Sequence, residues 1–162
     1  MYQVFDEAST PAASSDRVEA LLRELKKRRL KGFLVPHSDQ HQNEFLPPSE
    51  ERLAWLTGFT GSAGVAIVTD SGSALFVDGR YILQAPEQVD TEIFEVLQIP
   101  KAKPSEWLKS KLVRNNAVGY DARLHTISEI ERLTKSLGAA GIRLRALKDN
   151  PIDRIWGTAV SY

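Results

Sequence analysis

Hydrophobic residues recur with a helical spacing in the first part of the chain, after a polar, flexible lead-in over residues 1–15. Asp16 and Glu19 have the spacing of a helix capping box, so we expect a helix to begin at Asp16. Residues 26–29, all Lys or Arg, fall in its expected last turn, where positive charge suits the negative end of the helix dipole. The apolar positions that share one face of this predicted helix are Val18, Leu21, Leu22 and Leu25.

Short apolar runs between polar segments predict β-strands. Residues 32–35 suit a buried strand that Pro36 ends. Residues 63–69 and 74–78 are joined by the turn sequence DSGS, which predicts a β-hairpin. Further strands are expected at residues 92–99, 117–120 and 142–147.

More helices are expected between the strands. A short helix over residues 49–57 would have Ser49 as its N-cap and Gly58 as a left-handed terminator. Thr126 and Glu129 form a second capping box, which predicts a helix that Gly138 stops. Its predicted buried face consists of Ile127, Ile130, Leu133, Thr134 and Leu137. The other expected helical segments are residues 80–88, interrupted by Pro86, residues 104–113, and a final turn through Trp156 that Asn150 and Pro151 cap.

Strands that alternate with helices imply an α/β fold. The hairpin makes the central β-sheet mixed, and helices are expected on both of its faces. We expect residues 16–156 to form one domain, because 162 residues is the usual size of a single domain and no internal repeat is present. Residues 157–162 are expected to be a tail or the start of a linker.

Charge and composition exclude several classes of function. The 21 basic and 21 acidic residues cancel, so no general attraction to nucleic acid or to an anionic membrane is expected. There are no cysteines, which rules out disulfides, thiol nucleophiles and cysteine-ligated metal sites. The sequence shows no signal-peptide pattern and no apolar stretch long enough to cross a bilayer, so a cytoplasmic location is expected.

The segment HSDQHQNE at residues 37–44 holds two of the three histidines together with two carboxylates. On a helix, histidines at this spacing can bind zinc. Because Pro36 precedes the segment and Pro47 and Pro48 follow it, a loop is expected instead. We interpret the segment as a hydrogen-bonded polar loop, and an independent metal site is the alternative.

The sequence GFTGSAG at residues 58–64 matches neither the dinucleotide-binding GxGxxG pattern nor the nucleophile elbow GxSxG. It follows a helix and enters a strand, the reverse of the order that aims a helix N-terminus at a phosphate. We therefore expect a turn that needs positive φ or close backbone packing.

The DGRY sequence at residues 78–81 ends a predicted strand. An acidic residue and a guanidinium at the carboxyl end of a strand can project into a crevice, where Arg pairs well with carboxylates. The alternative is that Asp78 and Arg80 pair with each other and cap the next helix. His125 is interpreted as a surface or cap-adjacent residue. No set of residues in the sequence combines a nucleophile, a base and an orienting group, so no catalytic residue is assigned.

Several separated motifs, taken in order, resemble the N-terminal domain of aminopeptidase P. They are DxHQxE at residues 39–44, RLAWLTGFTGSAG at 52–64, DGRYxxQA at 78–85, VGYD at 118–121 and NPIDRIW at 150–156. The resemblance runs from about Asp16 to Trp156 and points to the cytosolic three-domain Xaa-Pro aminopeptidases, within the creatinase and prolidase group. The structural motif residues are Gly58, Gly61, Gly64, Asp78, Gly79 and Tyr81.

This resemblance implies an enzyme that releases an N-terminal residue preceding proline, with a pair of manganese ions in a separate C-terminal catalytic domain. None of the family's metal ligands maps onto this chain. The N-terminal domain is implied to help form a homodimer and to border the cleft that admits short proline-containing peptides. Arg80 is the best candidate for reaching the substrate, and Asp39, His41 and Glu44 are lesser candidates on the same side.

After Trp156 the family continues through a linker into further domains, whereas this sequence ends at Tyr162. The resemblance therefore implies that the chain is a piece of a longer peptidase. A complete chain of this length would instead favour a stand-alone module that binds peptides or small molecules. A creatinase-type domain, for hydrolysis of a C–N bond, is a weaker alternative because the motifs favour aminopeptidase P.

Overall fold

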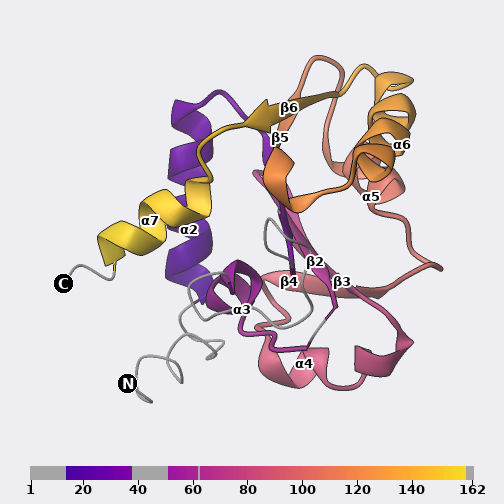
Figure 1. Cartoon of the computed structure of the whole chain (residues 1–162). Helices are drawn as coiled ribbons and strands as arrows, with labels where there is room; N and C mark the ends of the chain where they lie inside the picture. The colour runs from indigo at the N-terminus through magenta and orange to yellow at the C-terminus, as the bar shows by residue number, and fades with distance from the viewer. Residues whose placement is uncertain (1–13, 38–50, 62, 160–162) are drawn as a thin grey trace.

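The fold is built on a six-stranded β-sheet with helices on both sides (Figure 1). The computed structural model describes residues 14–37, 51–61 and 63–159. The strand order is β4-β3-β2-β1-β5-β6. The strands are β1 (Gly32–Pro36), β2 (Val65–Thr69), β3 (Gly72–Val77), β4 (Phe94–Gln98), β5 (Ala117–Asp121) and β6 (Arg143–Leu147).

Strand directions bring several strand ends to one edge of the sheet. The predicted hairpin is confirmed: β2 pairs antiparallel with β3, and also with β1. The β1–β5, β5–β6 and β3–β4 pairs are parallel. Among the described strands, β2 alone runs in the opposite direction. The carboxyl ends of β1, β3 and β5 therefore lie at the same edge as the start of β2, and open mixed sheets commonly bind ligands at such an edge.

Helices cover both faces of the sheet, as the sequence predicts. They are α2 (Ser14–Lys27), α3 (Arg52–Thr57), α4 (Ala85–Gln88), α5 (Pro104–Lys111), α6 (Ile127–Gly138) and α7 (Pro151–Ala159). One buried cluster joins α2, α3 and α7 to the sheet and includes Leu21, Leu56 and Ile152. The other joins α5 and α6 to the opposite face through Leu108 and Leu137. Figure 1 shows α2 and α7 on one side of the strands and α5 and α6 on the other.

An ion pair and an aromatic stack fasten α3 to α7. Arg52 binds Asp153 through two guanidinium nitrogens: Nε donates to Oδ1 at 2.8 Å and Nη2 donates to Oδ2 at 3.0 Å. The rings of Trp55 and Trp156 stack with centroids 5.4 Å apart. Two motifs from distant parts of the sequence, at residues 52–64 and 150–156, thus meet in space. The tryptophans act as packing anchors at this junction.

Several local predictions are confirmed. Gly58 ends α3 with a φ of 89°, and its N–H donates to the carbonyl of Ala54. Thr126 and Glu129 form the predicted capping box at the start of α6. Asn150 caps α7, because its side-chain oxygen accepts a hydrogen bond from the N–H of Ile152. The final helix continues to Ala159, beyond the predicted end at Trp156.

Other local predictions are wrong. The N-cap of α3 is Glu51, so the helix begins at Arg52 and not after Ser49, which lies outside the described residues. Residues 80–88 do not form one interrupted helix. They contain part of a 3-10 turn and the short helix α4. Pro86 lies in the first turn of α4, where backbone N–H groups make no hydrogen bonds within the helix, so its lack of an N–H costs no helical hydrogen bond.

The predicted buried face of α6 is only partly buried. Leu137 is buried, whereas Ile127 is 78% exposed and Thr134 is also exposed. Gly138 belongs to the helix, and the left-handed glycine is Gly141, with a φ of 77°. The spacing of apolar residues identified one helix face correctly, but the neighbouring elements cover only the part of that face nearest Leu137.

No helix within the described ranges is both long enough and apolar enough to cross a membrane.

Candidate functional site

The turn after β3 carries the DGRY sequence as a 3-10 helix, η3 (Gly79–Tyr81). Asp78 is its N-cap, and Oδ1 accepts a hydrogen bond of 2.9 Å from the backbone N–H of Arg80. The same carboxylate binds the guanidinium of Arg80, with Nη2 2.9 Å from Oδ2. The side chain of Arg80 nevertheless remains 67% exposed. This geometry is the alternative that the sequence offered, in which Asp78 and Arg80 pair with each other and cap the following helical turn.

Asp78 and Arg80 stabilise each other's charged forms. The hydrogen bond from the Arg80 side chain holds the pKa of Asp78 below its usual value. The guanidinium carbon of Arg80 also lies 5.1 Å from the ring centroid of Tyr81, which is a cation–π distance. The turn therefore holds the guanidinium of Arg80 in one direction at this edge of the sheet, paired with Asp78 and still largely exposed.

The ring of Tyr81 rests on the loop that leads into β2. Phe59 and Tyr81 pack edge to face, with ring centroids 5.5 Å apart. A Cβ atom at Gly61 would lie 2.3 Å from Cζ of Phe59 and 2.9 Å from Cδ1 of Tyr81. At Gly64 it would lie 3.1 Å from Cε2 of Phe59. The small residues of the GFTGSAG sequence therefore let the loop pack closely against the turn that carries Arg80.

Polar contacts fasten this loop to α4. Gln88 Oε1 accepts a 3.0 Å hydrogen bond from the N–H of Thr60, and Gln88 Nε2 donates to Thr60 Oγ1 at 2.8 Å. Leu83, which follows Tyr81 by two residues, is 84% exposed.

His37 and Glu51 lie close together at the end of β1, a pairing that sequence reasoning missed. His37 Nδ1 is 3.7 Å from Glu51 Oε1, and both side chains are mostly buried. Burial raises the pKa of the Glu51 carboxyl, against the opposing attraction of His37. The backbone N–H of His37 donates to the carbonyl of Gly64 at 3.0 Å, which links β1 to the start of β2. The available signal was the position of His37 directly after a buried strand.

The structure places the remaining candidates as follows. Asp39, His41 and Glu44 lie outside the described residues. His125 is buried beside the helix cap and is not a surface residue: its ring packs edge to face on Tyr120, and Nδ1 is 3.6 Å from Glu129 Oε1. In the described ranges no three His, Asp or Glu side chains gather where they could hold a metal ion, so these residues do not fit a dinuclear metal centre.

Comparison with known proteins identifies the family. The family described as "Creatinase/Prolidase N-terminal domain" matches residues 17–149. This chain belongs to that family. It is 35% identical over 158 residues to a probable Xaa-Pro aminopeptidase P of Coccidioides posadasii (strain C735), covering 96% of this chain and 24% of the relative. A protein of the same name from Laccaria bicolor is 37% identical over 146 residues, covering 89% of this chain and 23% of the relative. The chain thus spans about a quarter of these relatives' length.

Solved structures agree with this assignment. The X-prolyl aminopeptidase of Caenorhabditis elegans, described as a cytosolic enzyme with a di-nuclear active site, matches with a TM-score of 0.82 and 28% identity, over 88% of this chain and 25% of that one. A creatinase/prolidase-like N-terminal domain from Corynebacterium diphtheriae matches with a TM-score of 0.64 and 27% identity, over 83% of this chain and 96% of that one. The expected fold and the resemblance to aminopeptidase P N-terminal domains are confirmed.

Proposed function

We propose that this chain is the N-terminal accessory domain of a proline-specific metalloaminopeptidase and that the turn carrying Arg80 borders its substrate cleft. The observation that supports this role most directly is the exposed guanidinium of Arg80, fixed by Asp78 at the carboxyl edge of the sheet. The names of the relatives and the description of the matching family as an N-terminal domain agree with this proposal.

In this role the chain binds and orients peptide, while bond cleavage takes place elsewhere. Arg80 supplies positive charge for a carboxylate of a short proline-containing peptide, and Asp78 sets the direction of the guanidinium. A pair of manganese ions belongs, under this proposal, to a catalytic domain outside this chain. Asp39, His41 and Glu44 remain predicted to line the same side.

The wider organisation is part of the same proposal. Residues 16–156 form one domain that packs on the catalytic domain and contributes to a homodimer in the cytoplasm. Neither nucleic acid nor membrane is a partner, because the chain carries no excess of positive charge.

The substrate role of Arg80 can be tested by co-expressing this chain with an aminopeptidase P catalytic region. We expect Arg80→Ala to lower kcat/KM for Xaa-Pro peptides by roughly tenfold or more, as the loss of a charge-assisted contact does. Arg132→Ala is the matched control, since it removes an arginine from an exposed position on α6. Equal kcat/KM for Arg80→Ala and wild type across several peptide lengths would disprove substrate contact.

The accessory role is tested with the isolated chain, manganese and a chelator control. We expect no cleavage of an Xaa-Pro peptide. Metal-dependent turnover by this chain alone would show that it holds its own metal site, with residues 37–44 as the first place to look. Calorimetric binding of proline-containing peptides to the chain without its catalytic region would favour the stand-alone binding module instead.

A further inference from the structure

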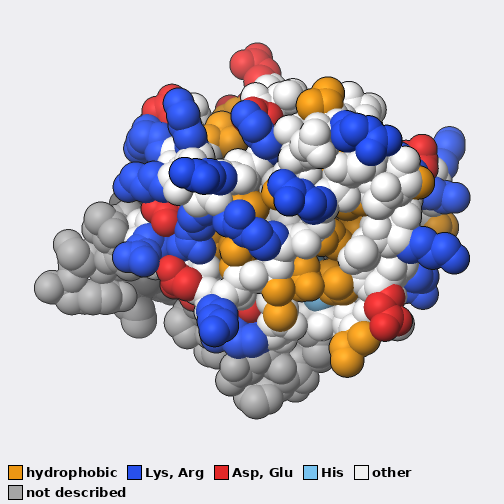
Figure 2. Space-filling view, turned by 90° about the horizontal axis from the view of Figure 1, so that it is seen from above, with side chains coloured by type: hydrophobic (Ala, Val, Ile, Leu, Met, Phe, Trp, Pro, Cys, Tyr) orange, Lys and Arg blue, Asp and Glu red, His pale blue; other side chains and the backbone are white. Residues whose placement is uncertain are grey.

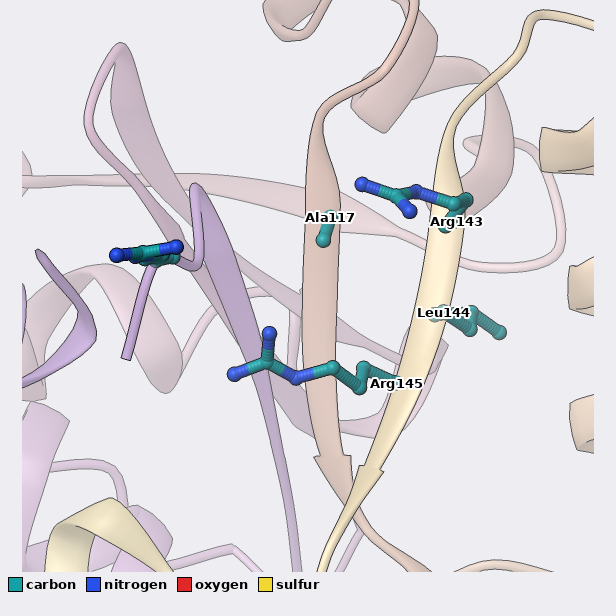
Figure 3. A pocket seen from close by; sticks show the side chains of 5 residues that line it. Ala117, Arg143, Leu144 and Arg145 are labelled. Atoms are coloured by element: carbon teal, nitrogen blue, oxygen red, sulfur yellow. The ribbon is translucent and has the colours of Figure 1, made fainter. Parts of the chain in front are cut away.

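Three arginine side chains line a pocket at the edge of the sheet where β5 and β6 begin. The pocket has a volume of about 320 Å³ and is lined by Arg29, Ala117, Arg143, Leu144 and Arg145 (Figure 3). We call it the arginine pocket. Arg29 comes from the segment after α2, and Arg143 and Arg145 come from β6, so residues more than a hundred positions apart in the sequence meet there. This edge is opposite to the one that carries Arg80.

The charges of the arginine pocket are not balanced by neighbouring carboxylates. Within the described ranges, none of its three guanidiniums forms an ion pair. Arginines elsewhere, such as Arg28, Arg52 and Arg123, do pair with Asp or Glu. Figure 2 looks down on the end of the molecule that is uppermost in Figure 1, and Lys and Arg side chains predominate there, with hydrophobic side chains between them. In a chain with no net charge, this end is locally basic.

Backbone carbonyls hold two of the guanidiniums in place without neutralising them. Arg145 Nη2 donates to the carbonyl oxygen of Arg28, and Arg143 Nη2 donates to that of Asn115 at 3.3 Å. Each contact uses one of the five N–H donors of a guanidinium. The positive charge stays available, and its position is fixed before any ligand arrives, which lowers the entropy cost of binding.

Arg29 occupies a backbone position that usually belongs to glycine. Its φ is 62°, and it directly follows the last turn of α2. The N–H of Leu30 donates to the carbonyl of Leu25 at 2.9 Å, the backbone pattern of a Schellman motif in which glycine is preferred. A large side chain here strains the backbone. Glycine would adopt this backbone conformation at lower cost.

We propose that the arginine pocket binds a small phosphate-bearing molecule. A tetrahedral phosphate presents oxygens in several directions, which suits guanidiniums that approach from two different elements, whereas one carboxylate presents its two oxygens in a single plane. The volume lies at the lower end of the range for small-molecule sites and leaves room for more than one phosphate group. Ala117 supplies apolar surface for the rest of the ligand, whereas the side chain of Leu144 points to the opposite face of the sheet (Figure 3). The inference does not depend on the proposed peptidase role.

Calorimetry with inorganic pyrophosphate at constant ionic strength tests the proposal on this chain. We expect saturable one-to-one binding that weakens roughly tenfold or more in Arg143→Gln and in Arg145→Gln. Arg132→Gln on α6 removes the same charge from an exposed position and is expected to leave affinity unchanged. Absence of binding at 10 mM pyrophosphate, or an equal loss of affinity in Arg132→Gln, would overturn the proposal.

A second variant separates binding from folding. Arg29→Gly relieves the backbone, so we expect a higher Tm without ligand together with loss of the Tm increase that pyrophosphate produces in the wild type. A pyrophosphate-induced Tm increase that survives in Arg29→Gly would remove Arg29 from the site. Citrate and a poly-glutamate peptide are the competing ligands: if either binds as tightly as pyrophosphate, the pocket recognises carboxylates and the assignment to phosphate is wrong.

Discussion

Two turns of this domain share the same Asp-x-Arg chemistry but differ in their surroundings. One follows β3 and contains Asp78 and Arg80; the other follows β5 and contains Asp121 and Arg123 in the 3-10 helix η4 (Ala122–Leu124). In each, the aspartate accepts hydrogen bonds from the backbone N–H and the guanidinium of the arginine two residues later, at 2.9 and 2.9 Å in the first turn and 3.0 and 2.8 Å in the second. Locally the two turns are almost the same structure.

Burial separates them. The side chain of Asp78 is 33% exposed, whereas that of Asp121 is 1% exposed. Asp121 also accepts a 3.0 Å hydrogen bond from Asn150, the residue that caps α7. Burial alone would raise the pKa of Asp121, but the hydrogen bonds from Arg123 and Asn150 outweigh it and keep the pKa low. The second turn therefore joins β5 to α7, while the side chains of the first remain partly exposed to solvent.

The comparison teaches that a local motif does not determine its own role. The same three-residue chemistry holds other elements together where its aspartate is buried, and stays in contact with solvent where its aspartate is partly exposed. Substitutions that act differently on the two turns are the sharpest way to test this distinction.

Replacing the buried aspartate has the largest expected effect. Asp121→Ala leaves Asn150 and Arg123 without their shared acceptor, and we expect a loss of about 3 kcal/mol in the free energy of unfolding, measured by urea denaturation. Asp78→Ala is the matched control and should be much less destabilising, because solvent replaces its contacts. Similar losses in the two variants would contradict the division of roles.

Gly61→Ala tests the support beneath the exposed turn. The new methyl group would overlap the rings of Phe59 and Tyr81, so we expect a loss of about 1 to 3 kcal/mol on urea denaturation. We also expect near-ultraviolet circular dichroism to change as the aromatic pair is displaced. An unchanged spectrum and stability would show that the loop does not pack on the turn as described.

Two windows in the pH dependence of stability should come from His125 and Asp121, which lie beside and in the buried turn. Burial lowers the pKa of His125, and the negative charges of Glu129 and Asp121 oppose this shift only in part. The contribution of His125 to the free energy of unfolding is therefore fully present above its unfolded pKa of about 6.5 and decreases as the pH falls below that value. Asp121 adds a second decrease below its unfolded pKa of about 3.9, because its folded pKa is lower.

Urea denaturation from pH 8 to pH 3 measures both windows. In His125→Gln the free energy of unfolding should no longer change with pH around pH 6.5, while the decrease at acidic pH should remain. If the change around pH 6.5 persists in this variant, another group causes it.

Gly79→Ala has the smallest expected effect. Gly79 has no positive φ, and a Cβ there meets only the side-chain amide of Gln98 at 3.2 Å. Ala122 already occupies the equivalent position in the buried turn. We expect a change within about 0.5 kcal/mol on thermal unfolding, with Ala122→Gly as the reciprocal variant. A loss well above that value would mean that the two turns are less alike than their hydrogen bonds indicate.

Several predictions that depend on a few neighbouring residues succeeded, although the predicted N-cap at Ser49 and the predicted helix stop at Gly138 did not. The capping box of α6, the left-handed Gly58 and the hairpin between β2 and β3 each follow from chemistry within about four residues, and sequence patterns report such chemistry directly. The mixed sheet with helices on both faces followed from the order of these elements.

Predictions that depend on coverage by distant segments failed or were not made. The spacing of apolar residues placed Ile127 on the core face of α6, but no spacing reports how far the neighbouring elements extend over that face. The difference between Asp78 and Asp121 arises from Asn150, which is 29 residues beyond Asp121. The arginine pocket joins Arg29 to β6, and the sequence offered only a cluster of charge at the end of a predicted helix. Contacts between distant segments decide burial, and burial decides the role of each motif.

The junction of α3 with α7 has a consequence for synthesis of the protein. Arg52 and Asp153 are 101 residues apart, and Ile152 and Trp156 complete the packing around α2 and α3. On the ribosome, α2 and α3 emerge long before the residues that cover them. Until α7 leaves the exit tunnel, the apolar side chains around Leu21 and Trp55 lack part of their cover, and a nascent-chain chaperone can bind this exposed surface.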